Sequence, residues 1–270
     1  MIARGRPHVG LPPFAPARTL PSDLAIATFS PMVISSESWP SNYLKGATAF
    51  DGVVYPDSDG QPMSDNTKQF KWIVLLKENL DTTLSCFVAG DLLWYPVKGH
   101  PEIRIGPDVL VAQGRPKGDR GSYIQSREDD VAPTVVFEVL SPSNNVREMS
   151  RKTAFYQAHG AKELIVIDPD AESGWAFVRN DANAFQPIDD VVGWTSPALG
   201  IRFERDGDAL IVRQPDGTRF LSFAELQARA DSAGEERKRA DEERKRADAA
   251  DARADRLAAK LAALGVSPDD

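Results

Sequence analysis

Residues 134–140 of the chain read TVVFEVL, and residues 105–111 read IGPDVLV. Both stretches are rich in β-branched and apolar residues, which is typical of a buried strand. Each also contains one carboxylate, Glu138 in the first stretch and Asp108 in the second. An ionised carboxylate in such a strand loses its hydration, at a cost of several kcal/mol unless a positive group replaces the water. The pair therefore predicts a cationic partner, a raised pKa or a bound divalent cation.

Around these two strands the hydrophobic pattern predicts a mixed α/β domain with one central sheet. Helical spacing of apolar residues predicts an amphipathic helix over 65–80, with Ser64 and Asp65 as candidates for its N-cap. A second helix is expected over 146–159, where Gly160 suits a C-cap. Strands are predicted at the following ranges: 85–88, 92–97, 103–112, 134–140, 164–167, 175–178 and 209–213.

The composition divides the chain into four predicted segments. Residues 1–34 are rich in proline with little periodicity and are expected to be flexible. Residues 35–221 hold the α/β domain. Residues 222–265 form a heptad-repeat helix, which is a candidate coiled coil, and residues 266–270 form a short tail.

The heptad-repeat segment allows two predictions. Small and apolar residues recur every seven positions: Ala233, Ala240, Ala247, Ala254 and Leu261. This spacing suits a coiled-coil seam, so the first prediction is a homo-oligomer formed through residues 222–265. The second is a solvated single helix, held by pairs such as Glu235 with Arg239. A second stripe, formed by Ala250, Leu257 and Leu264, is present only in the last three turns. Glu236 and Glu243 occupy its earlier positions, which favours the single helix over the first half, and alanine buries little area per residue.

Charge and composition exclude several classes of protein. The net charge of −8 argues against a protein that coats nucleic acid non-specifically. Cys86 is the single cysteine, which excludes an internal disulfide and a multi-cysteine zinc site. The N-terminus has no continuous hydrophobic stretch, so no signal peptide is expected, and no run approaches the ~18 apolar residues that span a bilayer. We therefore expect a cytoplasmic protein with no membrane partner.

The two carboxylates suit the chemistry of phosphodiester hydrolysis. That reaction needs a hard cation to polarise the phosphate and to lower the pKa of the attacking water. Magnesium prefers oxygen ligands and keeps several waters, so Asp108 and Glu138 would suffice to hold it, with manganese as a substitute. Lys152 is the candidate for orienting the water or neutralising charge that develops on the phosphate. On a helix it shares a face with Tyr156, four residues on.

Taken together, these motifs resemble a known family. The stretches that carry the resemblance are Pro107-Asp108, EVLSPS at 138–143, Lys152 with Tyr156, and ELIVIDP at 163–169. They resemble the Uma-two putative restriction endonucleases, a bacterial branch of the PD-(D/E)XK nuclease superfamily. The resemblance covers roughly residues 40–205. It implies a restriction-endonuclease-like central mixed sheet flanked by helices, and magnesium-dependent cleavage of DNA.

The resemblance also implies roles for individual residues. Asp108 matches the first metal-binding carboxylate of the superfamily, and Glu138 matches the second. The superfamily pattern expects a lysine two residues after Glu138, but this chain has Leu140 there. The resemblance therefore points to Lys152 on the following helix as the catalytic lysine, supported by Tyr156.

Each of these residues also has a simpler interpretation. Asp108 follows a proline and suits a turn residue at the start of a strand. An ion pair with Arg151 or Lys152 would satisfy Glu138 without a metal. Lys152 would otherwise be a surface lysine, and Tyr156 a core aromatic residue with its hydroxyl at the edge.

Other polar residues receive no catalytic role from the sequence. Asp91 reads as a turn residue, and Thr48 and Asn66 stand where family members often have an acidic residue or a histidine. Residues 114–121, GRPKGDRG, form the most basic and flexible stretch of the domain, but they lack the ending of a phosphate-binding P-loop. This stretch suits either contact with a nucleic-acid backbone or a solvated hairpin loop.

Three functions follow from these observations. The first is a magnesium-dependent endonuclease that hydrolyses DNA. The second is a non-catalytic module of nuclease fold that acts by binding or by assembly through the C-terminal helix. The third is a hydrolase of another phosphodiester, such as RNA.

Overall fold

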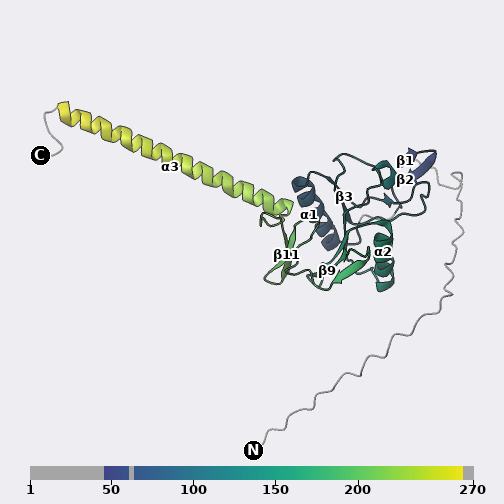
Figure 1. The fold of residues 1–270 in the computed structure, drawn as a ribbon. Coiled ribbons are helices and arrows are strands. Elements are labelled where there is room, and N and C mark those ends of the chain that lie inside the picture. Colours follow the sequence, from purple (N-terminus) through teal and green to yellow (C-terminus); the bar gives the residue numbers. More distant parts are fainter. Residues whose placement is uncertain (1–45, 61–63, 264–270) are drawn as a thin grey trace, which may run out of the picture. The chain divides into compact units, whose positions relative to one another are not determined.

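The computed structural model describes residues 46–60 and 64–263 of the chain (Figure 1). The segments predicted at 1–34 and 266–270 lie outside the described residues, and the boundary predicted at residue 222 stays a prediction. In chain order the elements are β1 (Ala47–Phe50), β2 (Val53–Pro56), α1 (Thr67–Thr83), β3 (Phe87–Gly90), β4 (Trp94–Tyr95), β5 (Val109–Ala112), β6 (Tyr123–Ile124), a 3₁₀ turn (Gln125–Arg127), β7 (Val135–Val139), α2 (Val146–His159), β8 (Glu163–Asp168), β9 (Ser173–Arg179), β10 (Phe185–Ile188), β11 (Arg202–Asp206), β12 (Ala209–Arg213) and α3 (Phe223–Ala263).

A six-stranded sheet in the order β10-β9-β8-β7-β5-β3 forms the centre of the domain. β7 and β8 are parallel neighbours joined by α2, and every other neighbouring pair in this sheet is antiparallel. A parallel pair needs a crossover connection, which α2 provides. The mixed α/β class with one central sheet, predicted from the sequence, is confirmed.

Each face of the sheet packs against its own helix. Alternate residues of β7 point to opposite faces, so Phe137 belongs to the cluster that contains Leu76 of α1. Val136 belongs to the other cluster, together with Tyr156 of α2. Figure 1 shows α1 and α2 on either side of the strands. Because both faces are covered, β7 and β8 are buried throughout, apart from partly exposed Asp168.

The predicted helices are confirmed, but both ends of the first helix differ from the prediction, since α1 ends at Thr83 and not at Leu80. α2 spans the residues predicted for it, Asn145 accepts a hydrogen bond from the Glu148 N–H at its start, and Gly160 ends it with φ +100°. α1 begins later than predicted, because Asn66 is its N-cap. The Asn66 side chain accepts hydrogen bonds from the N–H groups of Lys68 and Gln69, at 2.9 and 3.0 Å. Ser64 and Asp65 are therefore not the cap.

Several strands that precede α2 are shorter than the sequence predicted, and one is shifted along the chain. Of the range 103–112 only Val109–Ala112 pairs within the central sheet, because Gly106 and Pro107 interrupt the strand and proline has no N–H to donate. Of the range 92–97 only Trp94–Tyr95 is a strand. The predicted strand at 85–88 is observed at Phe87–Gly90. The β1–β2 hairpin and the short strands β6, β10 and β11 were not predicted.

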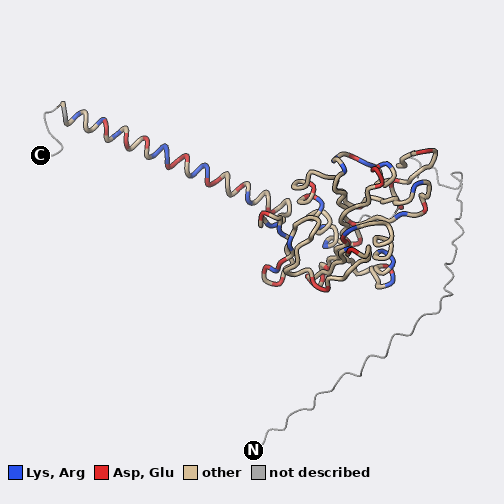
Figure 2. Tube along the Cα trace, viewed as in Figure 1, with Lys and Arg blue, Asp and Glu red and all other residues tan. Residues whose placement is uncertain are grey.

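The long helix α3 starts from a capping box. Ser222 N–H and Oγ donate to Glu225 Oε2 at 2.8 and 2.7 Å, and Glu225 N–H donates back to Ser222 Oγ at 3.3 Å. Asn79 of α1 holds the preceding residue, since it exchanges two hydrogen bonds with the backbone of Leu221. Beyond this start almost every described residue of α3 is exposed, and basic and acidic residues alternate along it (Figure 2). Within the part of the chain that the structure describes, no helix has both the length and the apolar character to cross a bilayer.

Glu163, at the start of β8, connects the central sheet to the loop that follows β10. Its buried carboxylate accepts hydrogen bonds from Ser196 Oγ at 2.5 Å and from the Ala198 N–H at 2.7 Å. We expect Glu163→Ala to lower the free energy of unfolding by about 2 kcal/mol, because two buried donors lose their acceptor. Urea titration followed by circular dichroism measures this, and an unchanged midpoint would contradict it.

A pH series tests the ionisation of the same carboxyl group. Burial raises the pKa of Glu163 above its ordinary value of 4.5. The folded state therefore binds the proton of the Glu163 carboxyl group more tightly than the unfolded state does. The stability that this bound proton contributes is lost as the pH rises through the folded pKa. We expect Glu163→Gln, which cannot ionise, to gain stability relative to wild type as the pH is raised above about 4.5. If the difference in stability between Glu163→Gln and wild type does not vary with pH, the raised pKa of Glu163 is contradicted.

Candidate functional site

The four residues predicted for the site meet where β5 begins and β7 ends. β5 and β7 are antiparallel, with Val109 opposite Phe137. Continued by one residue, this register places Asp108 opposite Glu138. The two carboxylates therefore lie on neighbouring strands at one end of the sheet, as their positions in two adjacent apolar strands require.

Glu138 is 2% exposed, and both of its carboxylate oxygens accept hydrogen bonds from α2. Lys152 Nζ donates to Glu138 Oε2 at 2.7 Å, and the hydroxyl of Tyr156 donates to Oε1. Burial raises the pKa of Glu138, while Lys152 and Tyr156 act in the opposite direction. Burial by itself would lower the pKa of Lys152, but the adjacent Glu138 carboxylate raises it above its ordinary value. Lys152 is therefore a protonated hydrogen-bond donor.

The sequence of α2 explains how two donors reach one carboxylate. Lys152 and Tyr156 are one turn apart, so they project from the same face of the helix. The ring of Tyr156 lies parallel to that of Trp94, with centroids 6.2 Å apart. Trp94 is itself fixed by a 3.0 Å hydrogen bond from its Nε1 to Gln125. The predicted core role of Tyr156 and its contact with the site are thus both present.

Asp108 is held in place by the backbone of β7. Its Oδ2 accepts a hydrogen bond from the Val139 N–H at 2.6 Å. Burial, and then the neighbouring charge of Glu138, raise the pKa of Asp108 to about 8, against the opposing effects of Val139 and Lys152. Burial is the largest of these causes, so the ionised form of Asp108 is disfavoured unless further positive charge is supplied.

These side chains fit a hard divalent cation. Asp108 uses one carboxylate oxygen for Val139, which leaves Oδ1 for a ligand. Each oxygen of Glu138 accepts one hydrogen bond and retains a further lone pair. Two carboxylates with water at the other positions are a common set for magnesium. Among the residues that the structure describes, no group of three or more His, Cys, Asp and Glu side chains is arranged for a metal.

Leu140 stands where the superfamily pattern expects a lysine, and it contributes to the hydrophobic cluster on the α2 side of the sheet. Lys152 reaches Glu138 from the helix instead. The two other residues considered near the first helix have local structural contacts. Asn66 caps α1, and Thr48 Oγ1 donates to Asp57 at 3.0 Å.

The sequence pattern predicts Asp65 only as a helix cap and does not indicate that it lies beside the site. Its Oδ2 accepts hydrogen bonds from Ser143 and, at 2.5 Å, from Ser141, both in the loop that follows β7. These two bonds lower the pKa of Asp65, and Lys152 contributes to the same shift. Asp65 is therefore an ionised group beside the site. The available signal was the SPS run at 141–143, whose hydroxyls need an acceptor.

Gln69 connects the backbone of Asp65 to the end of β7 through its buried side-chain amide. Its Oε1 accepts from the Asp65 N–H at 2.8 Å, and its Nε2 donates to the Val139 carbonyl at 2.9 Å. The same Val139 residue donates its N–H to Asp108. Gln69 and Asp108 thus bind the main chain of one residue from two sides, a relationship that the helical pattern of α1 could not indicate.

Asp91 was also left out of the site by sequence reasoning. Its N–H donates to the Asp108 carbonyl at 3.0 Å, and its backbone has a left-handed φ of +47°. Burial, followed by the charge of Asp59, raises the pKa of Asp91 to about 6. It combines the predicted turn geometry with a position next to the carboxylate pair.

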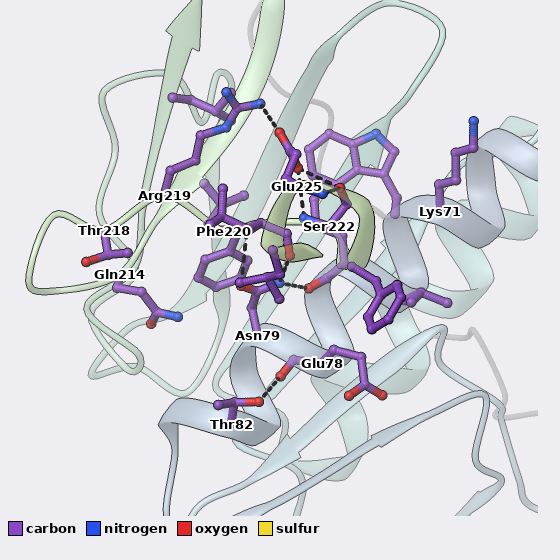
Figure 3. A pocket seen from close by; sticks show the side chains of 18 of the residues that line it. Lys71, Glu78, Asn79, Thr82, Gln214, Thr218, Arg219, Phe220, Ser222 and Glu225 are labelled. Carbon is purple, nitrogen blue, oxygen red and sulfur yellow. Dashed lines mark hydrogen bonds and ion pairs between the residues drawn. The ribbon is translucent and has the colours of Figure 1, made fainter. Parts of the chain in front are cut away.

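A separate cavity of about 800 Å³ lies between α1, β12 and the start of α3 (Figure 3). Its exposed apolar side chains include Phe70, Val74, Phe223 and Leu226. Two of the titratable groups that line it, Arg219 and Glu225, contact each other at 3.7 Å. It does not contain the predicted carboxylates, so the candidate site is the end of β7.

The ion pair between Lys152 and Glu138 generates a prediction about stability. Because Glu138 is buried, we expect Lys152→Met to lower the free energy of unfolding by about 3 kcal/mol, as an unpaired buried charge remains. Adding Glu138→Gln should restore most of this loss. Lys68→Met is the matched control, since its ion pair with Asp170 is exposed, and it should leave the urea midpoint unchanged. Equal effects of Lys68→Met and Lys152→Met would contradict the account.

Comparison with known proteins places this chain in a family. No curated protein matches the sequence. Among solved structures, a putative nuclease belonging to DUF820 from Anabaena variabilis is similar, with 13% sequence identity and a TM-score of 0.34. The match covers 55% of this chain and 78% of that one. The family Uma2, described as "Putative restriction endonuclease", matches residues 47–203, a range that contains all four predicted site residues. The chain therefore belongs to the Uma2 family of putative restriction endonucleases.

Proposed function

We propose that the protein is a magnesium-dependent endonuclease that hydrolyses phosphodiester bonds of DNA. The observation that carries the proposal is the convergence of Asp108, Glu138, Lys152 and Tyr156 at one end of the sheet. Membership of the Uma2 family supports a nuclease in general. Magnesium dependence and the choice of DNA are the more specific parts of this proposal.

Asp108 and Glu138 would hold the cation, through Oδ1 of the first and the remaining lone pairs of the second. At such a site a bound Mg²⁺, or Mn²⁺ in its place, polarises the phosphate and lowers the pKa of a bound water. Lys152 is protonated, so its role is to donate a hydrogen bond and to offset negative charge on the reacting phosphate. Tyr156 orients the Glu138 carboxylate and keeps Lys152 on the other oxygen.

One observation favours the second function, a non-catalytic module. The 2.7 Å ion pair satisfies Glu138 with a side chain of this protein, as the simpler interpretation of the sequence expected. Such a module needs no metal, whereas the raised pKa of Asp108 indicates a pocket that would be stabilised by further positive charge. Metal binding therefore separates the two functions.

Cleavage of supercoiled plasmid DNA tests the catalytic proposal. With magnesium or manganese, we expect wild type to cut, and Glu138→Ala and Lys152→Ala each to lose about 100-fold or more of that rate. Glu163→Gln is the matched control, because it alters a buried carboxylate of the neighbouring strand outside the site, and it should cut like wild type. Addition of EDTA should abolish cutting. Equal metal-dependent cutting by wild type and both site variants would contradict the assigned roles.

We also propose that copies of the chain associate into a homo-oligomer through residues 222–265. The stripe from Ala233 to Leu261 has the seven-residue period of a coiled coil, and Leu257 and Leu261 are 53% and 41% exposed. The opposing observation is the contact of Lys238 with Glu235 at 2.9 Å, which supports an isolated helix.

Sedimentation equilibrium tests this association. We expect wild type to be a dimer or higher oligomer, and the double variant Leu257→Arg, Leu261→Arg to be a monomer, because it places charge in the proposed seam. Arg substitution of Ala259, outside the stripe, is the control. A monomeric wild type would contradict the proposal.

A further inference from the structure

Large apolar side chains are exposed at two separate places along α3. Within the described ranges seven large apolar side chains are exposed, and six of them lie around the start of α3 or near its end. Phe223 and Leu226 are at the start, and Leu257 and Leu261 are near the end. Between residues 226 and 257 the helix has alanine as its only apolar residue. A partner that packs along α3 would therefore find its large apolar contacts at the two ends.

The exposed residues at the start of α3 are continuous with the cavity of about 800 Å³ (Figure 3). Phe70 and Val74, one turn apart on α1, line the same cavity and are 45% and 38% exposed. Asn79 of α1 exchanges hydrogen bonds with Leu221, directly before α3, and so fixes the two helices at this point. The cavity is therefore an apolar groove that α1 and α3 form together.

The heptad stripe of α3 begins in this cavity. Leu226 stands seven residues before Ala233, so it is the first member of the stripe that ends at Leu261. The second stripe runs three residues behind the first and has charged residues at its earlier positions: Arg229, Glu236 and Glu243. Ser222, Leu226 and Arg229 are successive seam positions, and all three line the cavity. The seam of α3 therefore faces the cavity, which makes α3 of a second copy its expected occupant.

The charges of the seam disfavour a parallel pair of helices. In a parallel pair each seam position faces the same position of the second copy. Arg229 would then face Arg229, and Glu236 and Glu243 would each face an identical glutamate. Like charges at such short range repel more strongly in a partly desolvated seam than in water.

An antiparallel pair removes all three like-charge layers in one register. If Leu226 packs on Leu257 of the second copy, each layer joins a member of the first stripe to a member of the second. The layers between are Ala233 with Ala250, Ala240 with Glu243, Ala247 with Glu236, and Ala254 with Arg229. Every charged residue of the seam then faces an alanine.

The edges of the seam fit the same register. Glu225, just before Leu226, would lie opposite Lys260 of the second copy, so opposite charges meet at each end. Arg239 and Arg246 would face each other across the middle, but each has Glu243 of its own chain within one helical turn. The register also brings Leu261 of the second copy level with Ser222, where the cavity lies.

We propose that this cavity receives the C-terminal end of α3 from a second copy, so that two chains pair antiparallel along their helices. The proposal rests on the proposed association through residues 222–265 and adds its direction and its contact with the α/β domain. The arrangement is two-fold symmetric, since each copy fills the cavity of the other. The two Leu226 residues then lie about 45 Å apart along the helix axis.

Distances between spin labels test the antiparallel order. A nitroxide attached to Ala228→Cys lies outside the seam near the start of α3, and the natural Cys86 is buried and does not take up the label. In an antiparallel pair two such labels are about 40 Å apart or more, whereas labels on Glu242→Cys, near the centre, are about 20 Å apart. Double electron–electron resonance measures both distances. A short distance at both positions would show a parallel pair and overturn the proposal.

Substitutions in the cavity test the contact with the domain. We expect Phe70→Ser and Phe223→Ser each to raise the dissociation constant of the pair about tenfold in sedimentation equilibrium, because an apolar contact with the second copy is lost. Phe223 is 79% exposed, so its replacement should leave the melting temperature of the domain unchanged. Val146→Ser is the matched control, since Val146 is also an exposed apolar residue but lies on α2, and it should associate like wild type.

The outcomes separate this proposal from the proposed association. A monomeric wild type would contradict both. An oligomer with a short label distance at residue 228 would keep the association and overturn its antiparallel order. A label distance of about 40 Å, together with equal dissociation constants for Phe70→Ser, Phe223→Ser and Val146→Ser, would overturn the cavity as the contact.

Discussion

The carboxylate of Glu138 lies inside the sheet, where an ionised group is several kcal/mol less stable than in water unless charged or polar partners replace the solvent. Here the replacement comes entirely from α2, whose Lys152 and Tyr156 occupy the two oxygens. This constraint fixes the rotation of α2 about its axis and the position of Trp94, which packs on Tyr156. It also explains why the helix that connects two parallel strands contributes to the site as well as to the core.

The pair of facing carboxylates has an electrostatic consequence. Asp108 and Glu138 carry two negative charges when both are ionised, and Lys152, bonded to Glu138, provides one positive charge nearby. Burial, and next the charge of Glu138, raise the pKa of Asp108 to about 8, and the charge of Lys152 offsets only part of this shift. A divalent cation would offset the remaining negative charge, which is the physical reason to favour a metal-dependent enzyme over a module whose buried charge is already neutral. The ionised carboxylate of Asp65 lies beside the site and adds a further negative charge.

Much of the fold could be predicted from the sequence, because long periodic segments such as α2 and the buried strands β7 and β8 have unambiguous patterns. Short elements such as β4 and the β1–β2 hairpin could not, since their pairing depends on tertiary contacts. At the site, the sequence singled out carboxylates in apolar strands and a lysine one helix later. It could not find Gln69 or Asp65, whose contacts are to residues more than 60 positions away in the chain.

Calorimetric titration with Mn²⁺ tests whether the Asp108–Glu138 pair holds a metal ion. We expect wild type to bind the ion, and Asp108→Asn to lose this binding because it removes a charged oxygen donor from the pair. Asp170→Asn, at an exposed carboxylate outside the site, is the control and should bind like wild type. Absence of binding in wild type, or equal binding by wild type and Asp108→Asn, would contradict the assignment of the carboxylate pair as a metal site.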